Sequence, residues 1–307
     1  MDRLRTLDLF VRIVDRGSFT AAAAELGISR PVATAAIRAL EERLGTRLLE
    51  RSTRHVRPTT DGLTYCRSAR SILAGLEDAD RAVGGSVSGT VRVDVPGNIA
   101  RTLLLPALPP LLRAHPGLQL LFGEGERFVD LLREGVDCVV RSGTLVSSDM
   151  VARRVGAFEE IVCASPDYLR RHGTPATPDD LDGHEAVGFV SSRTGAVLPL
   201  EFQQNGVVRE ILLPSRVLVT TGGVGNEAAC QGFGLYQAPK RGFLPMLRAG
   251  VLVEVLAGFR PPPTPVSVMH HSHRQVPARL RVVLDWLADT LQAALAEELD
   301  TTPGSVP

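Results

Sequence analysis

Residues 17–62 decide the fold of the N-terminal part of this chain; they read GSFTAAAAELGISRPVATAAIRALEERLGTRLLERSTRHVRPTTDG. Ser18 is a suitable N-cap for a short, alanine-rich helix, and Gly27 allows a tight turn after it. Ser29 caps a further helix, in whose first turn Pro31 is tolerated because no intrahelical N–H bond is lost there. Two short helices joined by a glycine turn predict a helix-turn-helix, whose second helix presents its N-terminal residues to the major groove of DNA.

Another helix precedes this pair, because apolar residues recur at helical spacing before a glycine stop at Gly17: Leu4, Leu7, Phe10, Val11 and Val14. These features alone fit a plain three-helix bundle as well as a helix-turn-helix. Two further patterns favour DNA binding. The outward face of the third helix has no carboxylate before Glu41, and residues 47–59 predict two short strands around an arginine-rich tip. Such a hairpin is typical of a wing that touches phosphates or a minor groove.

Positive charge is concentrated at this end of the chain. The 307 residues carry a net charge of zero, but residues 1–60 hold eleven Arg against seven Asp and Glu, which leaves +4 there and −4 in the remainder. Lys240 is the only lysine. Basic contacts therefore depend on arginine, whose guanidinium suits bidentate contacts with phosphates and base edges.

The segment 61–86 is predicted to be a linker, with a helix from about Asp61 to Val83 and a Gly84-Gly85-Ser86 hinge. Apolar residues along this helix follow alternating steps of three and four, a pattern that packs against a second copy of the helix. A helix that lies on its own domain is the alternative. The expected dimer contacts are Tyr65, Ala69, Ile72, Leu73, Leu76 and Val83. Two-fold symmetry of the pair implies an inverted-repeat DNA site.

With these patterns the chain resembles the LysR-type transcriptional regulators. The residues that carry the resemblance in the N-terminal part are Gly17–Ala23, Leu26–Ser29, Ile37–Gly45, Arg47–Leu49 and Thr59–Gly62. Further matches are Phe128–Leu131, Val151–Gly156, Ala164–Leu169, Gly232–Leu235, Gly250–Val253, Pro261–Val266 and Val282–Leu287. The resemblance implies a winged helix-turn-helix at residues 1–60, a dimerising linker helix and a C-terminal domain that binds a small co-inducer.

Against the family pattern, the recognition helix is poor in large polar side chains, since Ala35 and Ala36 stand where such residues are common. We therefore expect direct base readout to rest on Arg30, Thr34 and Arg38, with more of the specificity coming from DNA shape. The full set of expected DNA contacts is Ser18, Thr20, Ser29, Arg30, Pro31, Thr34, Ala35 and Arg38, with Arg51, Ser52, Thr53, Arg54 and Arg57 in the wing.

Residues 87–307 alternate strands and helices in a parallel α/β pattern. The expected elements are strands at Val91–Val95, Leu118–Phe122, Asp137–Arg141, Ala186–Val190, Ile211–Val219, Gly234–Ala238 and Val266–Met269, and helices at Ile99–Ala114, Phe128–Glu134 and Pro277–Glu298. The chain crosses to a second region and returns, which predicts two α/β subdomains about a cleft, as in periplasmic-binding proteins. Their expected bounds are 87–162 plus 266–300, and 163–265.

In open α/β folds, ligands bind beyond the carboxyl ends of the strands, where backbone N–H groups and helix N-termini face a crevice. This rule nominates Pro96, Gly97, Asn98, Arg141, Ser142, Gly143, Ser191, Ser192, Thr220, Thr221 and Gly222 as effector contacts. Several helix N-termini together with Arg141 favour a ligand that bears a carboxylate. For each single residue, a turn in an unliganded cleft is the alternative.

Other reactive residue types do not form a recognisable catalytic or metal site. Adjacent histidines at 270 and 271 point to opposite faces of a strand, so they cannot readily converge with His273 on a metal. The four cysteines form no CxxC pair, and the glycine-rich run 221–225 lacks the Lys of a phosphate loop. We expect no metal, no cofactor and no catalytic residues.

The chain is thus predicted to be an all-α winged helix-turn-helix domain plus a linker helix, followed by an α/β two-subdomain, periplasmic-binding-protein-like effector domain. The function predicted is sequence-specific transcription regulation of the LysR type, gated by a small molecule. A solute-binding protein and an enzyme on the same scaffold are the alternatives. No signal peptide or membrane span is expected, which indicates the cytoplasm. The expected partners are DNA, further copies of the chain as a homodimer or homotetramer, the effector and RNA polymerase.

Overall fold

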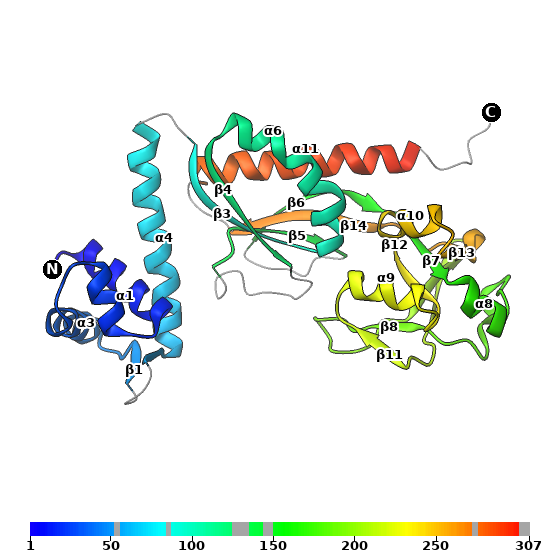
Figure 1. Cartoon of the computed structure of the whole chain (residues 1–307), viewed down its shortest axis with the longest axis horizontal. Helices are drawn as coiled ribbons and strands as arrows, with labels where there is room; N and C mark the ends of the chain where they lie inside the picture. Colours follow the sequence, from blue (N-terminus) through cyan, green and yellow to red (C-terminus); the bar gives the residue numbers. More distant parts are fainter. Residues whose placement is uncertain (52–55, 84–86, 125–134, 144–149, 272–275, 301–307) are drawn as a thin grey trace. The chain divides into compact units, whose positions relative to one another are not determined.

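The structure is a computed structural model that describes residues 1–51, 56–83, 87–124, 135–143, 150–271 and 276–300 (Figure 1). The chain divides into two compact units, and the division along the sequence falls between Val87 and Ser88. The predicted helix at Phe128–Glu134, the wing tip 52–55, the glycines of the hinge and His273 lie outside the described residues.

The first unit opens with three helices, α1 (Arg3–Arg16), α2 (Phe19–Glu25) and α3 (Arg30–Leu44). Side-chain oxygens of Asp2 and Ser18 accept hydrogen bonds from first-turn N–H groups of α1 and α2, as N-caps do. The helices enclose one apolar core, whose fully buried members include Leu9, Phe10, Ile13, Ala22, Ala33 and Ile37. This core fixes the angle between α2 and α3.

The wing and the linker helix complete this unit. Strands β1 (Leu49–Arg51) and β2 (Val56–Pro58) pair antiparallel, and α4 (Thr60–Val83) follows them directly. Thr59 caps α4, since its Oγ1 accepts from the N–H of Gly62 at 2.9 Å. The first half of α4 packs on α1, where Tyr65 meets Phe10 edge-to-face with ring centroids 5.6 Å apart.

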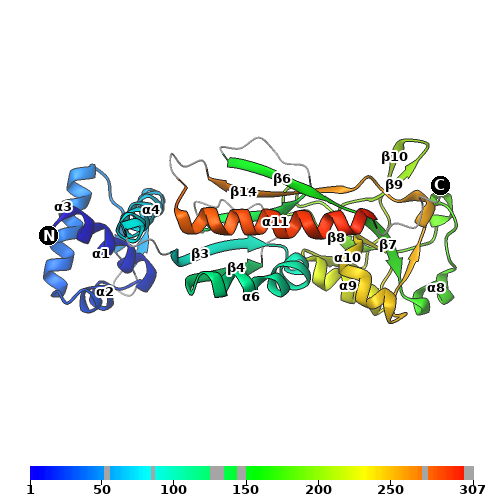
Figure 2. The same ribbon diagram turned by 90° about the horizontal axis from the view of Figure 1, so that it is seen from above.

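The second unit contains a five-stranded sheet in the order β4-β3-β5-β14-β6. Its strands are β3 (Ser88–Val95), β4 (Gly117–Glu124), β5 (Cys138–Ser142), β6 (Met150–Phe158) and β14 (Thr264–His271). Strands β3, β4 and β5 run parallel as expected. Strand β14 pairs antiparallel with both β5 and β6, so the sheet is mixed. After β3 come α5 (Gly97–Ile99), η1 (Ala100–Leu104) and α6 (Leu105–Ala114). Helix α11 (Ala278–Asp300) runs along the sheet, as Figure 2 shows, and buries Leu287 and Leu291.

A second, smaller set of strands follows β6. Strands β12 (Tyr236–Pro239), β7 (Glu160–Ala164) and β13 (Val253–Val255) form an antiparallel sheet, and β8 (Val187–Phe189) pairs parallel with β11 (Val217–Val219). Strands β9 (Leu200–Gln204) and β10 (Val207–Ile211) form a hairpin. The helices are α8 (Pro166–His172), η2 (Pro178–Leu181), α9 (Gly222–Cys230), α10 (Lys240–Arg248) and η3 (Ala257–Phe259).

The chain crosses between the two sheets at Glu159, slightly before the expected boundary at residue 162, and returns at Thr264. Glu159 is held at this crossing by two cations. Its Oε2 lies 2.7 Å from Nζ of Lys240, and its Oε1 pairs with Arg260, which also binds Glu254 at 2.6 Å. The strand expected at 211–219 is wrong as one element, because β10 ends at Ile211 and β11 begins only at Val217.

Replacing a glycine of α4 by alanine should have opposite effects on the free energy of unfolding at Gly62 and at Gly75. A Cβ at Gly62 would lie 1.9 Å from the carbonyl oxygen of Leu48, whereas a Cβ at Gly75 would meet no atom within 4 Å. We expect Gly75→Ala to raise the free energy of unfolding by about 0.5–1 kcal/mol through helix propensity. Gly62→Ala should lower it by about 1–3 kcal/mol because the backbone must move.

Urea denaturation of the two variants beside the wild type measures both effects. Equal stabilisation by the two alanines would contradict the close approach of α4 to Leu48.

Candidate nucleic-acid interface and effector site

The outward face of α3 carries the residues expected to contact DNA. Ala33, Ile37 and Leu40 point into the core, which leaves the opposite side of the helix to solvent. On that side Arg30, Pro31, Ala35 and Arg38 are exposed and Thr34 is half-buried. Helical spacing places Val32 on the apolar core face, but its side chain is 49% exposed. Val32 is thus an exposed apolar side chain near the start of α3, which the helical spacing does not identify.

The arginines of this face differ in how they are held. Arg38 pairs with Glu42 one turn later, with Nε 3.0 Å from Oε1, and both side chains are largely exposed. Exposed pairs of this kind are weak, so a phosphate or a base edge can replace the carboxylate. Arg30 forms no ion pair with any side chain that the structure describes. It stands in the first turn of α3, beside the exposed N-cap Ser29.

The other expected DNA contacts lie around this helix. Ser18 caps α2, its Oγ accepting from the N–H of Ala21 at 3.3 Å, and Thr20 is exposed. In the wing, Arg57 is exposed on β2 opposite Glu50 of β1. Arg51 ends β1, but its side chain lies outside the described residues, as do Ser52, Thr53 and Arg54.

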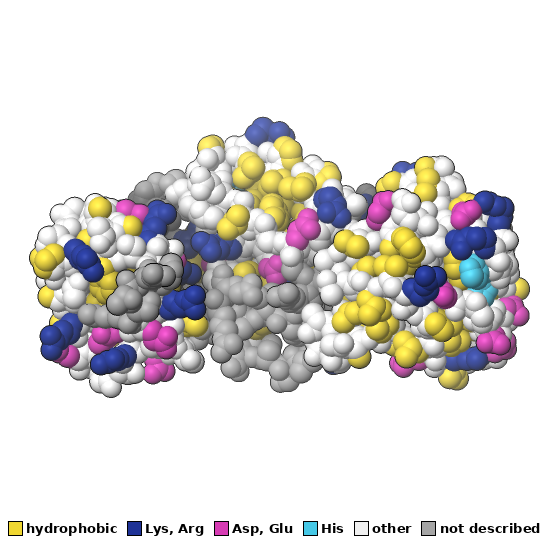
Figure 3. Space-filling view, turned by 60° about the horizontal axis from the view of Figure 1, so that its bottom comes forward, with side chains coloured by type: hydrophobic (Ala, Val, Ile, Leu, Met, Phe, Trp, Pro, Cys, Tyr) yellow, Lys and Arg dark blue, Asp and Glu magenta, His cyan; other side chains and the backbone are white. Residues whose placement is uncertain are grey.

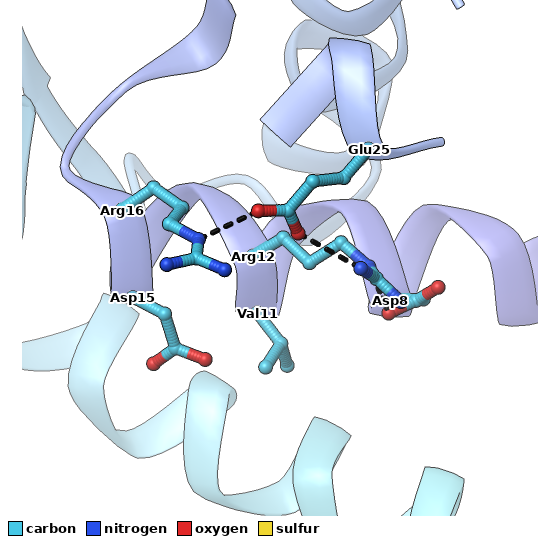
Figure 4. Close-up of a pocket in the computed structure, with 6 residues that line it drawn as sticks. All are labelled: Asp8, Val11, Arg12, Asp15, Arg16 and Glu25. Carbon is cyan, nitrogen blue, oxygen red and sulfur yellow. Dashed lines mark hydrogen bonds and ion pairs between the residues drawn. The ribbon is translucent and has the colours of Figure 1, made fainter. Parts of the chain in front are cut away.

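Part of the positive charge of this end of the chain is neutralised inside the unit. Figure 4 shows Arg12 and Arg16 of α1 reaching Glu25 of α2, at 2.9 and 2.6 Å, beside a shallow groove of about 430 Å³. Arg12 also pairs with Asp8 at 2.8 Å. The hydrogen bond from Arg12 lowers the pKa of Glu25, so its carboxylate stays ionised. These two arginines tie α1 to α2.

The residues expected to form the dimer seam divide into two groups along α4. Ala69 is 1% exposed, and Tyr65 packs on Phe10, so both are engaged by their own unit. Ile72 and Leu76 are 51% and 42% exposed further along the helix. Leu73 is half-buried, and the side chain of Val83 is outside the described residues.

A cavity in the second unit lies between the first turns after β3 and helix α9. Its volume is about 580 Å³, and its lining includes Gly97, Arg101, Glu124, Thr221, Gly223, Val224, Glu227 and Phe233. Of the residues expected to contact an effector, only Gly97 and Thr221 line it. Arg101 is the cation of this lining, beside the carboxylates of Glu124 and Glu227. Its Nη1 lies 3.3 Å from Oε1 of Glu124, and its Nη2 donates to Oδ1 of Asn98 at 3.1 Å.

Arg101 reaches across to α9 because Gly223 has no side chain. A Cβ there would lie 2.9 Å from Nη2 of the arginine. Sequence reasoning missed Arg101, although it stands one helical turn after Gly97, so the helical repeat was the available signal. No sequence pattern identifies the other lining residues Glu124, Glu227 and Phe233. They meet at the cavity only because the chain folds β4 and α9 next to each other.

The expected effector contacts at 141–143 are part of the sheet instead. Nη2 of Arg141 lies 2.6 Å from Oδ2 of Asp94, and the two side chains are 11% and 8% exposed. The carboxylate already neutralises this guanidinium, so Arg141 is not a free anion site. Ser142 pairs with β14, and the N–H of Gly143 donates to the carbonyl of Pro265 at 2.8 Å.

The remaining nominated residues do not line the cavity either. Ser191 and Ser192 belong to a turn, in which the N–H of Ser191 donates to the carbonyl of Ala196. Pro96, Asn98, Thr220 and Gly222 stand next to lining residues in the sequence but are not themselves part of the lining.

Comparison with known proteins bears on both units. A model of the family "Bacterial regulatory helix-turn-helix protein, lysR family" matches residues 4–63, and a model of the "LysR substrate binding domain" matches residues 84–292. An HTH-type transcriptional regulator of Escherichia coli K12, YhjC, is 36% identical over 96% of this chain and 100% of its own length. The chain belongs to the LysR family of transcriptional regulators. The predicted family is confirmed.

Two further similar proteins cover nearly the whole chain. An HTH-type transcriptional repressor of Pseudomonas aeruginosa UCBPP-PA14 is 30% identical over 99% of this chain and 96% of its own. The solved structure of CrgA, a LysR-type transcriptional regulator from Neisseria meningitidis, covers 95% of this chain and 99% of its own, with 29% identity and a TM-score of 0.59. The fold expected from the sequence, a helix-turn-helix domain followed by a two-subdomain α/β domain, is confirmed.

As a member of the LysR family, the chain is a transcriptional regulator and not an enzyme. Burial raises the pKa of the thiols of Cys138, Cys163 and Cys230, which keeps them protonated and weakly nucleophilic. No three His, Cys, Asp or Glu side chains within the described ranges are placed to hold a metal ion. No described helix is long and apolar enough to span a bilayer.

Proposed function

We propose that this LysR-family regulator binds an inverted-repeat DNA site as a homodimer or a dimer of dimers, and that a small carboxylate-bearing effector gates it from the cavity beside Arg101. The observation that carries the DNA-reading part is the exposed face of α3, with Arg30 and Arg38 on it, in the same compact unit as the arginine-bearing wing. RNA polymerase is the further partner that such a function implies.

Within this interface the residues have different proposed roles. Arg30 and Thr34 read base edges from the first turns of α3, and Pro31, Val32 and Ala35 offer apolar contacts to thymine methyls. Arg57 contacts phosphate from the wing, and Arg38 exchanges Glu42 for phosphate or base. Ser18, Thr20, Ser29, Arg51, Ser52, Thr53 and Arg54 complete the proposed contact set.

Dimerisation is proposed to use the C-terminal half of α4. Ile72 and Leu76 are exposed large apolar side chains one turn apart, the spacing at which two helices pack against each other. Val83 extends this row by sequence, and Leu73 flanks it. The second unit also exposes apolar groups outside the cavity, among them Leu105 and Leu112, and Figure 3 shows hydrophobic side chains gathered on its surface. Exposed apolar patches of this kind support a second contact and hence a tetramer.

We propose an effector with an apolar part and a carboxylate that pairs with Arg101, in a cavity whose lining also holds the carboxylates of Glu124 and Glu227. Arg101 is 53% exposed and its pairing with Glu124 spans 3.3 Å, so a ligand carboxylate can compete for it. Val224 and Phe233 supply the apolar wall, and the N-terminus of α9 lies at the same place. Because residues from both subdomains line the cavity, a bound effector would shift the packing of the two. In the oligomer that shift would alter how the paired headpieces meet DNA.

Two arginine substitutions separate base reading from phosphate contact. We expect Arg30→Ala to reduce discrimination between specific and unrelated DNA by about 1–3 kcal/mol, because the alanine cannot reach a base edge. Arg57→Ala should weaken binding to all sequences and lower the slope of log K against log salt by about 1. Gel shifts over a salt series, on the DNA upstream of the gene for this protein, measure both, with Arg113→Ala as the matched control for charge.

An equal loss of affinity on all sequences for Arg30→Ala would reduce this residue to a phosphate contact. Wild-type binding without sequence preference or salt dependence would overturn the proposed DNA-reading function.

Charge placed on the exposed apolar row of α4 should separate the dimer. Ile72→Lys and Leu76→Lys each introduce an ammonium group where the second helix would pack, and burial of an unpaired charge is costly. We expect sedimentation velocity to show smaller species and the gel shift to lose cooperativity. Leu63→Lys, which alters an exposed leucine in the first turn of the same helix, is the control and should leave the assembly unchanged. An unchanged assembly in all three variants would exclude this row as the seam.

A thermal-shift screen of small aliphatic and aromatic carboxylates tests the effector site. A ligand present at 100 times its Kd stabilises the folded chain by about 2.7 kcal/mol, which raises Tm by several degrees. We expect Arg101→Ala to abolish the rise given by the active compound, because its carboxylate loses its counter-charge, while Arg113→Ala keeps it. An undiminished rise in Arg101→Ala would place the ligand elsewhere in the chain.

A further inference from the structure

Glu41 connects the recognition helix to the base of the wing. It stands in the last turns of α3, and its Oε1 accepts hydrogen bonds from two consecutive backbone N–H groups, those of Leu48 at 2.8 Å and Leu49 at 3.0 Å. The two leucines are 1% and 3% exposed. A carboxylate that accepts from buried N–H groups forms stronger hydrogen bonds than a neutral acceptor does. Without it, the two donors would lose their partner away from water.

Besides Glu41, the wing is held by the side chains of Leu48 and Leu49, which are buried in the core of the unit, and by the N–H of Val56, which donates to the carbonyl of Gly17 at 3.4 Å. Hydrogen bonds within the hairpin add little to this. Its described ladder has only three residue pairs, and one of them, Leu49 with Pro58, includes a residue that has no N–H to donate. A two-stranded hairpin of this length is marginal by itself. The orientation of the wing therefore depends on what holds its first strand.

The opposite side of the same segment is held by the start of α4. The N–H of Thr59 donates to the carbonyl of Leu48 at 3.0 Å, and Oγ1 of Thr59 donates to the carbonyl of Arg47 at 2.8 Å. These bonds tie the wing to the linker helix but do not reach α3. Of the hydrogen bonds between described residues, those of Glu41 are the ones that join the wing backbone to a side chain of the recognition helix.

We propose that Glu41 is a positioning residue: it fixes the wing at a set distance and angle from α3, and so determines which phosphates beside the major-groove site the wing reaches. The side chain itself does not contact DNA. This role rests on the proposed function, in which α3 reads bases and the arginines of the wing contact phosphate. In this role the carboxylate that ends the basic face of α3 is bound to backbone N–H groups of the wing.

The test compares Glu41→Ala, Glu41→Gln and Ile37→Val on one duplex, chosen as the sequence that the wild-type protein selects from a random pool. Gln keeps a side-chain acceptor for the two N–H groups, and Ala removes it. Ile37→Val removes a methylene from the buried face of the same helix and leaves the hydrogen bonds of Glu41 in place, so it controls for a general loss of stability. The readouts are a hydroxyl-radical footprint and the slope of log K against log salt.

We expect Glu41→Ala to keep protection at the centre of each half-site, to leave the flanks unprotected, and to lower the salt slope by about 1 for each phosphate that the wing no longer reaches. Glu41→Gln should restore flank protection and slope, and Ile37→Val should alter neither. If Glu41→Ala does not fold, Glu41→Asp, which withdraws the carboxylate by one methylene, should show the same unprotected flanks and lower slope.

The positioning role would be overturned if Glu41→Ala gave the same flank footprint and the same salt slope as Ile37→Val. If Glu41→Asp is used in its place, the same comparison applies to that variant. Failure of the wild-type protein to select any sequence from the pool would instead overturn the proposed DNA-reading function. The two failures are therefore distinguishable.

Discussion

The close approach of α4 to the backbone of Leu48 is the constraint on which the first unit depends. Only a residue without Cβ allows the carbonyl of Leu48 to lie where it does against Gly62, and that proximity places Thr59 within hydrogen-bonding distance of the same peptide. Glu41 then holds the adjacent N–H groups from the side of α3. Recognition helix, wing and linker helix thus meet at one dipeptide, Leu48-Leu49. The backbone of this dipeptide is therefore the point where the linker helix and the wing are in direct contact.

Local chemistry made much of the first unit predictable. The N-cap serines, the turn glycines and the alternating steps of three and four along α4 are short-range signals, and the observed helices begin and end within a residue or two of the expected positions. Ser18 caps α2 through its hydroxyl as expected, whereas Ser29 occupies the N-cap position of α3 without a side-chain hydrogen bond to it. The partners of individual side chains could not be predicted in the same way. That Arg12 and Arg16 are neutralised by Glu25, and that Tyr65 and Ala69 pack on their own unit, depends on how α1 lies against α2 and α4. No local pattern encodes that packing.

The difference between short-range signals and long-range packing also explains why only two of the expected effector contacts line the cavity of the second unit. The rule that ligands lie beyond the carboxyl ends of strands led to Gly97 and Thr221, but it also nominated Arg141, which forms a buried pair with Asp94 on the neighbouring strand. An arginine at a strand end looks the same in sequence whether it faces a crevice or a carboxylate. The identity of its partner follows from strand order, and strand order is a long-range property. Arg101, one helical turn after Gly97, could have been inferred from the helical repeat, but its closeness to Gly223 of α9 depends on long-range packing.

The cations of this regulator are almost all guanidinium groups. The single lysine is not at the DNA face: Lys240 is 20% exposed and bonded to Glu159, where the chain crosses between its two sheets. Acetylation removes the charge of a lysine amine, but it does not act on a guanidinium. The electrostatic part of DNA binding is therefore out of reach of lysine acylation.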